Sequence, residues 1–177
     1  VIFELVRSVS RMTDGYDCAG NPIGEPPAFF TGVAINPCAD DLDAEIARMR
    51  RKVDAGAHFL MSQVFFEWAP WERLLDRCGG ALPLPALVAV WPLSSLRLAL
   101  RLHHEVPGIF VPADLLADLE RAGAEAARVG MDRARALLVG RPDAQVRLVD
   151  LVPPGALPAI PCTRPWTRLE LHDGVPD

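Results

Sequence analysis

Four apolar runs of strand length, separated from one another by helical patterns, constrain this sequence most. The runs cover residues 29–35, 57–66, 84–91 and 146–152. They are apolar at nearly every position instead of alternating with polar residues, which is typical of strands covered on both faces. Such strands belong to parallel sheets that are joined by crossover helices. The order therefore predicts an α/β fold with a parallel sheet.

Helical periodicity fills the segments between these runs. The expected helices cover residues 2–12, 42–55, 69–78, 94–104 and 112–139, the last one broken near Gly123 and Gly130. Four β/α units are half of a (β/α)8 TIM barrel, so we predict a partial barrel, with an open sheet as the alternative. Half a barrel would expose an apolar sheet face and unpaired strand edges. We therefore expect either a partner that supplies the missing half or a homo-oligomer.

We divide the chain into a barrel-like domain over residues 1–152 and a proline-rich tail over residues 153–177. Its 177 residues are enough for one domain with a real core. The net charge of −5 argues against a nucleic-acid surface. The absence of an apolar stretch of about 20 residues argues against a membrane span.

The chain does not open with a secretory signal pattern. The four cysteines are scattered without paired spacing, so we expect no metal site and a reducing, cytoplasmic location.

Two polar residues stand out between residues 48 and 67. Gln63 lies near the carboxyl end of an apolar run, where parallel sheets build ligand sites, although it could equally be a satisfied polar core residue. Lys52, the only lysine of the chain, could bind a phosphate or could lie on a solvated helix face, paired with Glu45 or Asp54. Glu45 and Lys52 are seven residues apart and share one helix face, with Arg48 between them.

These segments resemble the methylenetetrahydrofolate reductase family. The resemblance is carried by Lys-Val-Asp-Ala-Gly-Ala at residues 52–57 and by Ser-Gln-Val-Phe-Phe-Glu at residues 62–67. It continues in the stretches 31–37, 90–95 and 108–112, and it covers about residues 1–150. The resemblance implies the carboxyl-terminal half of the family's barrel, about its last four β/α units, so the missing part would be the amino-terminal half-barrel.

The resemblance also implies an activity and its ligands. Members of the family are FAD-containing enzymes that use NAD(P)H to reduce 5,10-methylenetetrahydrofolate to 5-methyltetrahydrofolate. Gln63 would hydrogen-bond the pterin ring, and Leu96 would lie against the substrate. Glu45 and Lys52 match positions that hold the adenosine and diphosphate of FAD, while Arg48 lies on the same face and Arg51 could reach a phosphate.

The sequence departs from the family pattern at several points. The family's general acid, a glutamate on the first strand, would lie upstream of Val1, so we expect no catalytic residue within this chain. The histidine-proline turn after the fifth strand is shortened to Pro37-Cys-Ala-Asp40, and the closing strand motif is not recognisable around residues 146–154. The alternative is therefore a non-catalytic or degenerate half-barrel that a partner stabilises.

Overall fold

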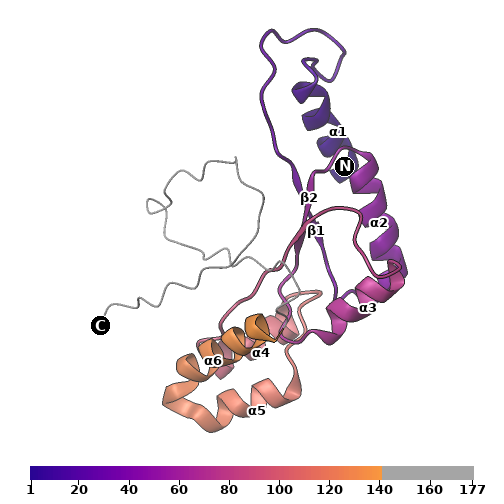
Figure 1. The fold of residues 1–177 in the computed structure, drawn as a ribbon. Coiled ribbons are helices and arrows are strands. Elements are labelled where there is room, and N and C mark those ends of the chain that lie inside the picture. Colours follow the sequence, from indigo (N-terminus) through magenta and orange to yellow (C-terminus); the bar gives the residue numbers. More distant parts are fainter. Residues whose placement is uncertain (141–177) are drawn as a thin grey trace.

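The computed structural model describes residues 1–140, which form an α/β fold (Figure 1). The expected strand at 146–152, the domain boundary at 152 and the tail lie outside the described residues. The elements are α1 (Ile2–Thr13), β1 (Gly32–Ile35), α2 (Leu42–Asp54), β2 (Phe59–Ser62), α3 (Ala69–Arg77), β3 (Ala86–Leu87), α4 (Leu96–Glu105), α5 (Ala113–Ala122), the 3-10 turn η1 (Gly123–Glu125) and α6 (Ala126–Val139). The predicted alternation of helices and strands is confirmed.

The three strands form one parallel sheet in the order β1-β2-β3. Val33 pairs with Leu60, and Met61 pairs with Leu87. This arrangement confirms the predicted parallel sheet and is compatible with part of a barrel. The described strands do not close a ring, so the barrel itself remains a prediction.

One face of the sheet is covered and the other is not, so the expectation that these strands are covered on both faces is wrong for the described residues. Val33, Ile35 and Leu60 are buried on the face that carries the helices, whereas Met61 on the opposite face is 48% exposed. In Figure 1 α1, α2 and α3 lie along one side of β1 and β2. The uncovered face is the one that a half-barrel was expected to expose.

The strands are also shorter than predicted. At β3, a proline and a hydrogen bond to a side chain limit the pairing with β2. Pro85 has no N–H and cannot donate to a ladder, although its carbonyl accepts from the Leu60 N–H at 2.8 Å. The Ala89 N–H donates to the Ser62 hydroxyl at 2.8 Å instead of to a backbone carbonyl. Regular pairing between β2 and β3 is therefore confined to a few residues.

Local signals in the sequence set the ends of α2 and α4. The Asp41 carboxylate accepts from the Ala44 N–H at 2.9 Å and caps the start of α2. Gly56 follows the end of α2 with a φ of +107°, and a Cβ there would lie 2.7 Å from the Ser10 hydroxyl, so glycine is required twice over. The Ser95 hydroxyl caps α4 by accepting from the Leu98 N–H.

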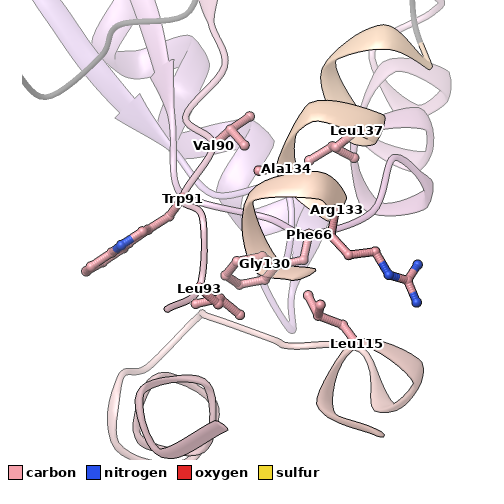
Figure 2. Close-up of a pocket in the computed structure, with 9 residues that line it drawn as sticks. All are labelled: Phe66, Val90, Trp91, Leu93, Leu115, Gly130, Arg133, Ala134 and Leu137. Carbon is pink, nitrogen blue, oxygen red and sulfur yellow. The ribbon is translucent and has the colours of Figure 1, made fainter. Parts of the chain in front are cut away.

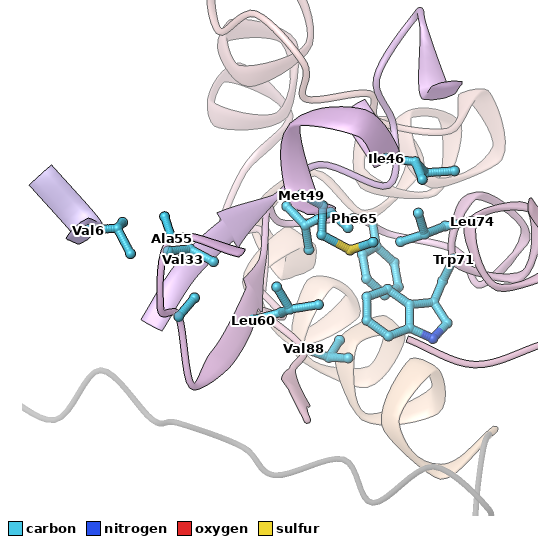
Figure 3. Close-up of a cluster of buried hydrophobic side chains, with 12 residues drawn as sticks. Val6, Val33, Ile46, Met49, Ala55, Leu60, Phe65, Trp71, Leu74 and Val88 are labelled. Carbon is cyan, nitrogen blue, oxygen red and sulfur yellow. The ribbon is translucent and has the colours of Figure 1, made fainter. Parts of the chain in front are cut away.

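Two hydrophobic clusters form the core. The first lies between the sheet and helices α2 and α3, and Figure 3 shows Met49, Leu60, Phe65, Trp71 and Leu74 converging there. The second gathers side chains from α4, α5, the start of α6 and the loops beside them, namely Leu93, Ala99, Leu102, Ile109, Val111, Leu115, Leu119 and Ala126. Burying each large aliphatic or aromatic side chain contributes about 1.5–3 kcal/mol, so these clusters account for much of the stabilisation.

The long carboxyl-terminal helix breaks at Gly123, as predicted, but the second expected break is wrong. Gly123 has a φ of +52° and begins the 3-10 turn between α5 and α6. Gly130 lies inside the continuous helix α6. A Cβ at Gly130 would lie 1.9 Å from the Leu93 carbonyl oxygen, so glycine there permits close packing and does not end the helix.

Candidate functional site

Asn36, which directly follows β1, joins the carboxyl end of this strand to other segments of the chain. Its N–H donates to the Glu45 carboxylate at 3.0 Å, and its side-chain oxygen accepts from the Cys38 N–H at 2.9 Å. Its side-chain amide donates to the Gly108 carbonyl at 3.1 Å. Asn36 therefore ties the loop after β1 both to α2 and to the loop after α4.

A groove of about 610 Å³ lies beside these loops. Its walls come from the loop after β1, from the start of α2, from α3 and the residues before it, and from the loop after α4. They comprise Pro37, Cys38, Ala39, Asp40, Leu42, Glu67, Pro70, Arg73, Asp76, Arg77 and Phe110. Ligand sites of open α/β sheets form at this end of the strands, but none of the six predicted site residues lines the groove.

Cys38 is the thiol in this groove, and its surroundings make it a poor nucleophile. Burial raises the pKa of the Cys38 thiol to about 11, while the positive charge of Arg73 lowers it and the negative charge of Glu67 raises it further. A thiol with so high a pKa carries little thiolate at neutral pH. Cys38 therefore fills space in the wall of the groove.

Glu45 lies on α2 with its carboxylate already fully engaged. The residue is 6% exposed. One oxygen accepts from the Asn36 N–H, and the other accepts from two nitrogens of Arg48 at 2.9 and 2.7 Å. The carboxylate thus joins the end of β1 to the Arg48 guanidinium.

Lys52 lies two turns further along the same face of α2. Its ammonium donates to the Ala34 carbonyl of β1 at 2.6 Å. The predicted common face of Glu45 and Lys52 is confirmed, because both side chains contact the backbone of β1. The alternative in which Lys52 pairs with Glu45 or Asp54 is not what the structure shows, since its ammonium bonds the Ala34 carbonyl.

The two arginines near Lys52 point in different directions. Arg48 is paired with Glu45, and its side chain is 50% exposed. The Arg51 guanidinium lies 3.9 Å from the centroid of the Phe3 ring of α1, a cation–π contact. The last turns of α2 therefore present positive charge to solvent, but the described structure does not gather these side chains around one cavity.

Gln63 directly follows β2 and continues its pairing with β1. Its N–H donates to the Ile35 carbonyl at 2.7 Å, and its side-chain oxygen accepts from the Val64 N–H at 3.1 Å. Because side chains alternate along a strand, Gln63 shares the uncovered face with Met61, opposite to the buried Leu60. Gln63 is half-buried at the carboxyl end of the sheet, and its side-chain amide donors have no acceptor within residues 1–140.

Leu96, the remaining predicted site residue, is the first residue of α4. It is half-buried and packs against the second hydrophobic cluster. Leu96 therefore lies in a packing position.

A small apolar pocket lies where α6 crosses the loop after β3. Figure 2 shows Phe66, Leu93, Leu115, Gly130 and Leu137 around it, while the Trp91 ring points away. Arg133 at its rim is held by Asp114 and Asp118. These contacts are those of helix packing.

Sequence reasoning treated Asn36 only as the end of a strand. The signal that could have revealed its linking role is the Asn-Pro pair itself, since asparagine side chains commonly hydrogen-bond the backbone two residues on. Its bonds to Glu45 and Gly108 could not be read from the sequence.

Two further classes of feature are absent from the described part of the chain. Within residues 1–140, no helix combines the length and apolar character that crossing a membrane requires. The same residues hold no group of three or more histidine, cysteine or carboxylate side chains placed to bind a metal ion.

Comparison with known proteins identifies relatives of the chain. The probable methylenetetrahydrofolate reductase (NADPH) of Caenorhabditis elegans is 28% identical over 124 residues, which are 66% of this chain and 16% of that protein. The 5,10-methylenetetrahydrofolate reductase of Escherichia coli is 29% identical over 80 residues, 45% of this chain and 27% of that protein. The Salmonella typhimurium enzyme of the same name is 32% identical over 66 residues, 37% of this chain and 22% of that protein.

The chain thus spans between 16% and 27% of the length of these relatives. The family model for methylenetetrahydrofolate reductase matches residues 1–137, which include β1, β2 and β3 and nearly all of α6. On that match, the chain belongs to the methylenetetrahydrofolate reductase family.

Proposed function

We propose that this chain forms part of an FAD-dependent oxidoreductase that reduces 5,10-methylenetetrahydrofolate to 5-methyltetrahydrofolate with NAD(P)H. The observation that carries the proposal is the family match over residues 1–137. The scattered cysteines of the sequence support a cytoplasmic location for the enzyme.

The residues on α2 fit the diphosphate of FAD in charge. Arg48 and Arg51 present guanidinium groups at the surface, and a guanidinium can bind phosphate through two parallel hydrogen bonds. The Lys52 ammonium has three donors, of which the Ala34 carbonyl takes one, so two remain for a phosphate. When bound, FAD would supply the hydride transfer between the nicotinamide and the folate.

Glu45 fits this picture as a positioning residue. Its carboxylate is buried and occupied, so it does not suit direct contact with an adenosine hydroxyl. Its two bonds to Arg48 instead hold that guanidinium at the surface of α2. We expect Glu45 to act on the cofactor through Arg48.

Gln63 fits the recognition of a pterin edge. The amide lies on the uncovered sheet face at the carboxyl end of β2. Within residues 1–140 its two N–H donors bond no acceptor, so they can bond a ligand. A pterin ring offers both acceptors and donors, which an amide can match. Leu96 is half-buried at the start of α4 and stays a predicted substrate contact.

The second candidate is a non-catalytic half-barrel subunit that depends on a partner. The exposed apolar surface favours this candidate. Met61 on the uncovered sheet face is 48% exposed, and Phe30, just before β1, is 65% exposed. The covering partner would be either the amino-terminal half-barrel or another copy of the chain. Both candidates need a partner that covers this sheet face. They differ in whether the complete protein binds flavin and reduces the folate.

The experiment compares Gln63→Ala and Lys52→Met with wild type in the complete protein. Flavin content is measured by absorbance, and kcat/KM is measured for the folate. We expect Gln63→Ala to keep its flavin and lose about tenfold in kcat/KM, the equivalent of one hydrogen bond to the ligand, and Lys52→Met to lose flavin. Asn21→Ala, in the distant loop after α1, is the matched control and should change neither quantity.

Two results would overturn the proposal. One is a complete protein that takes up no flavin. The other is unchanged turnover in Gln63→Ala, which would move the amide out of the substrate site and favour the second candidate.

A further inference from the structure

Trp91 differs from the other two tryptophans of residues 1–140 in having no partner for its ring. The Trp68 indole N–H donates to the Leu137 carbonyl, and Trp71 is 6% exposed, with its ring stacked on Phe65. Trp91 is 41% exposed. Within the described part of the chain its indole N–H bonds no acceptor and its ring stacks on no other aromatic ring. A ligand that covers this ring would gain the free energy of burying its apolar surface.

The residues before Trp91 determine the side of the sheet on which its ring lies. Val88, just after β3, is 7% exposed and belongs to the first hydrophobic cluster, and Val90 packs against that cluster. Because side chains of an extended chain alternate, Ala89 and Trp91 point to the opposite, uncovered face. Figure 2 shows the Trp91 ring pointing away from Val90.

On this face Trp91 follows closely on the position of Gln63. The strands β2 and β3 run parallel, and the Ala89 N–H bonds the Ser62 hydroxyl at 2.8 Å. Gln63 comes directly after Ser62 and therefore lies beside Ala89, two residues before Trp91. In a closed barrel this face is the inner wall, and ligands bind at its carboxyl end. The arrangement involves only the neighbouring strands β2 and β3, so closure of the barrel would keep it.

We propose that Trp91 binds the folate substrate, with its indole covering one face of the pterin ring whose edge Gln63 bonds. This inference rests on the proposed function and adds a second substrate-binding side chain to it. An amide bonds a ring at its edge, whereas an indole stacks on the face of a ring, so the two side chains complement each other. The opposite face of the pterin then stays open to the hydride donor.

The strand order explains why the ring suits the substrate better than the cofactor. The residues proposed for the diphosphate of FAD lie on α2, which bonds β1 through Lys52. In the order β1-β2-β3, Trp91 follows the strand at the other end, and Gln63 follows the strand between them. The indole is therefore next to the proposed pterin contact and further from the proposed diphosphate contacts.

The test compares Trp91→Leu and Trp91→Phe with wild type in the complete protein. Stacking is present in the ground state and in the transition state alike, so its loss should raise KM for 5,10-methylenetetrahydrofolate and leave kcat nearly unchanged. We expect KM to rise about tenfold in Trp91→Leu and about twofold in Trp91→Phe, which keeps an aromatic ring. Tyr16→Leu, at a residue 49% exposed in the loop after α1, is the matched control and should keep the wild-type KM.

Fluorine NMR detects the contact directly and keeps the test decisive if Trp91→Leu does not fold. In protein labelled with 5-fluorotryptophan, the resonance that is missing from Trp91→Phe belongs to residue 91, and Trp71→Phe identifies the resonance of Trp71. Addition of 5,10-methylenetetrahydrofolate without NAD(P)H, so that no turnover occurs, should shift the Trp91 resonance more than that of the buried Trp71.

Flavin content distinguishes failure of this inference from failure of the proposed function. The role of Trp91 alone is wrong if the complete protein holds flavin and reduces the folate while Trp91→Leu keeps the wild-type KM. An unmoved Trp91 resonance in such a protein would have the same meaning. A complete protein that takes up no flavin and binds no folate would overturn both.

Discussion

Cys38 shows how the surroundings of one side chain set its chemistry. The residue follows the Asn-Pro turn at the end of β1, where the Asn36 side chain accepts from its N–H. Because burial disfavours the thiolate, the pKa of the folded thiol rises from 9.0 to about 11. In the unfolded chain the thiol would titrate near 9.0. The contribution of Cys38 to stability is therefore complete below pH 9 and is lost as the pH rises towards 11.

We expect slow alkylation of Cys38 with a late pH midpoint. The measurement compares a form whose only cysteine is Cys38 with a form whose only cysteine is the exposed Cys18. The iodoacetamide rate of the folded Cys38 form should reach half its maximum near pH 11, and denaturant should shift the midpoint towards 9. A folded midpoint near 9 would mean that the thiol is not desolvated.

The helix α6 depends on one glycine at its crossing with the loop after β3. Gly130 brings the helix backbone against Leu93, whose carbonyl oxygen would lie 1.9 Å from an added Cβ. The neighbouring atoms belong to backbone, so they cannot move aside as a flexible side chain could. The crossing also lines the small pocket of Figure 2.

Gly130→Ala should therefore destabilise the protein, although alanine is the better helix former by about 1 kcal/mol. We expect a loss of about 1–3 kcal/mol in the free energy of unfolding, measured with urea, as for other overpacked cores. Ala127→Gly, at an exposed position of the same helix, should lose about 1 kcal/mol through helix propensity alone. A more stable Gly130→Ala variant would contradict the close crossing.

Across the whole molecule, α6 connects the two hydrophobic clusters. Ala126 near its start belongs to the second cluster, while Leu137 and Leu138 near its end pack against the first. The Trp68 indole N–H donates to the Leu137 carbonyl at 2.7 Å and fixes this end of the helix beside the residues that follow β2. This bond therefore holds the end of α6 near the carboxyl end of the sheet, where Gln63 lies.

Trp68→Phe should loosen α6 and leave the sheet intact. Phenylalanine keeps an aromatic ring for the edge contact with Phe65 but cannot donate to Leu137. We expect a loss of about 0.5–1.5 kcal/mol in unfolding free energy and faster proteolysis within α6. Trp91→Phe, at a residue that is 41% exposed, is the control. Equal proteolysis of both variants would show that the indole bond does not hold the helix.

The sequence by itself determined the order of elements, the cap at Asp41, the glycine stop at Gly56 and the common face of Glu45 and Lys52. It also carried the family resemblance. These features depend on residues within a few positions of one another, since caps, turns and helix faces are short-range properties of the chain.

Only the tertiary structure decided the length of the strands, the covered face of the sheet, the linking role of Asn36 and the role of Gly130. It also decided that Glu45 is buried and bonded to backbone, a state that neither interpretation of Lys52 and its neighbours anticipated. Each of these outcomes depends on which distant segment comes to lie against a given residue. Periodicity and spacing describe one segment at a time, so they could not supply those contacts.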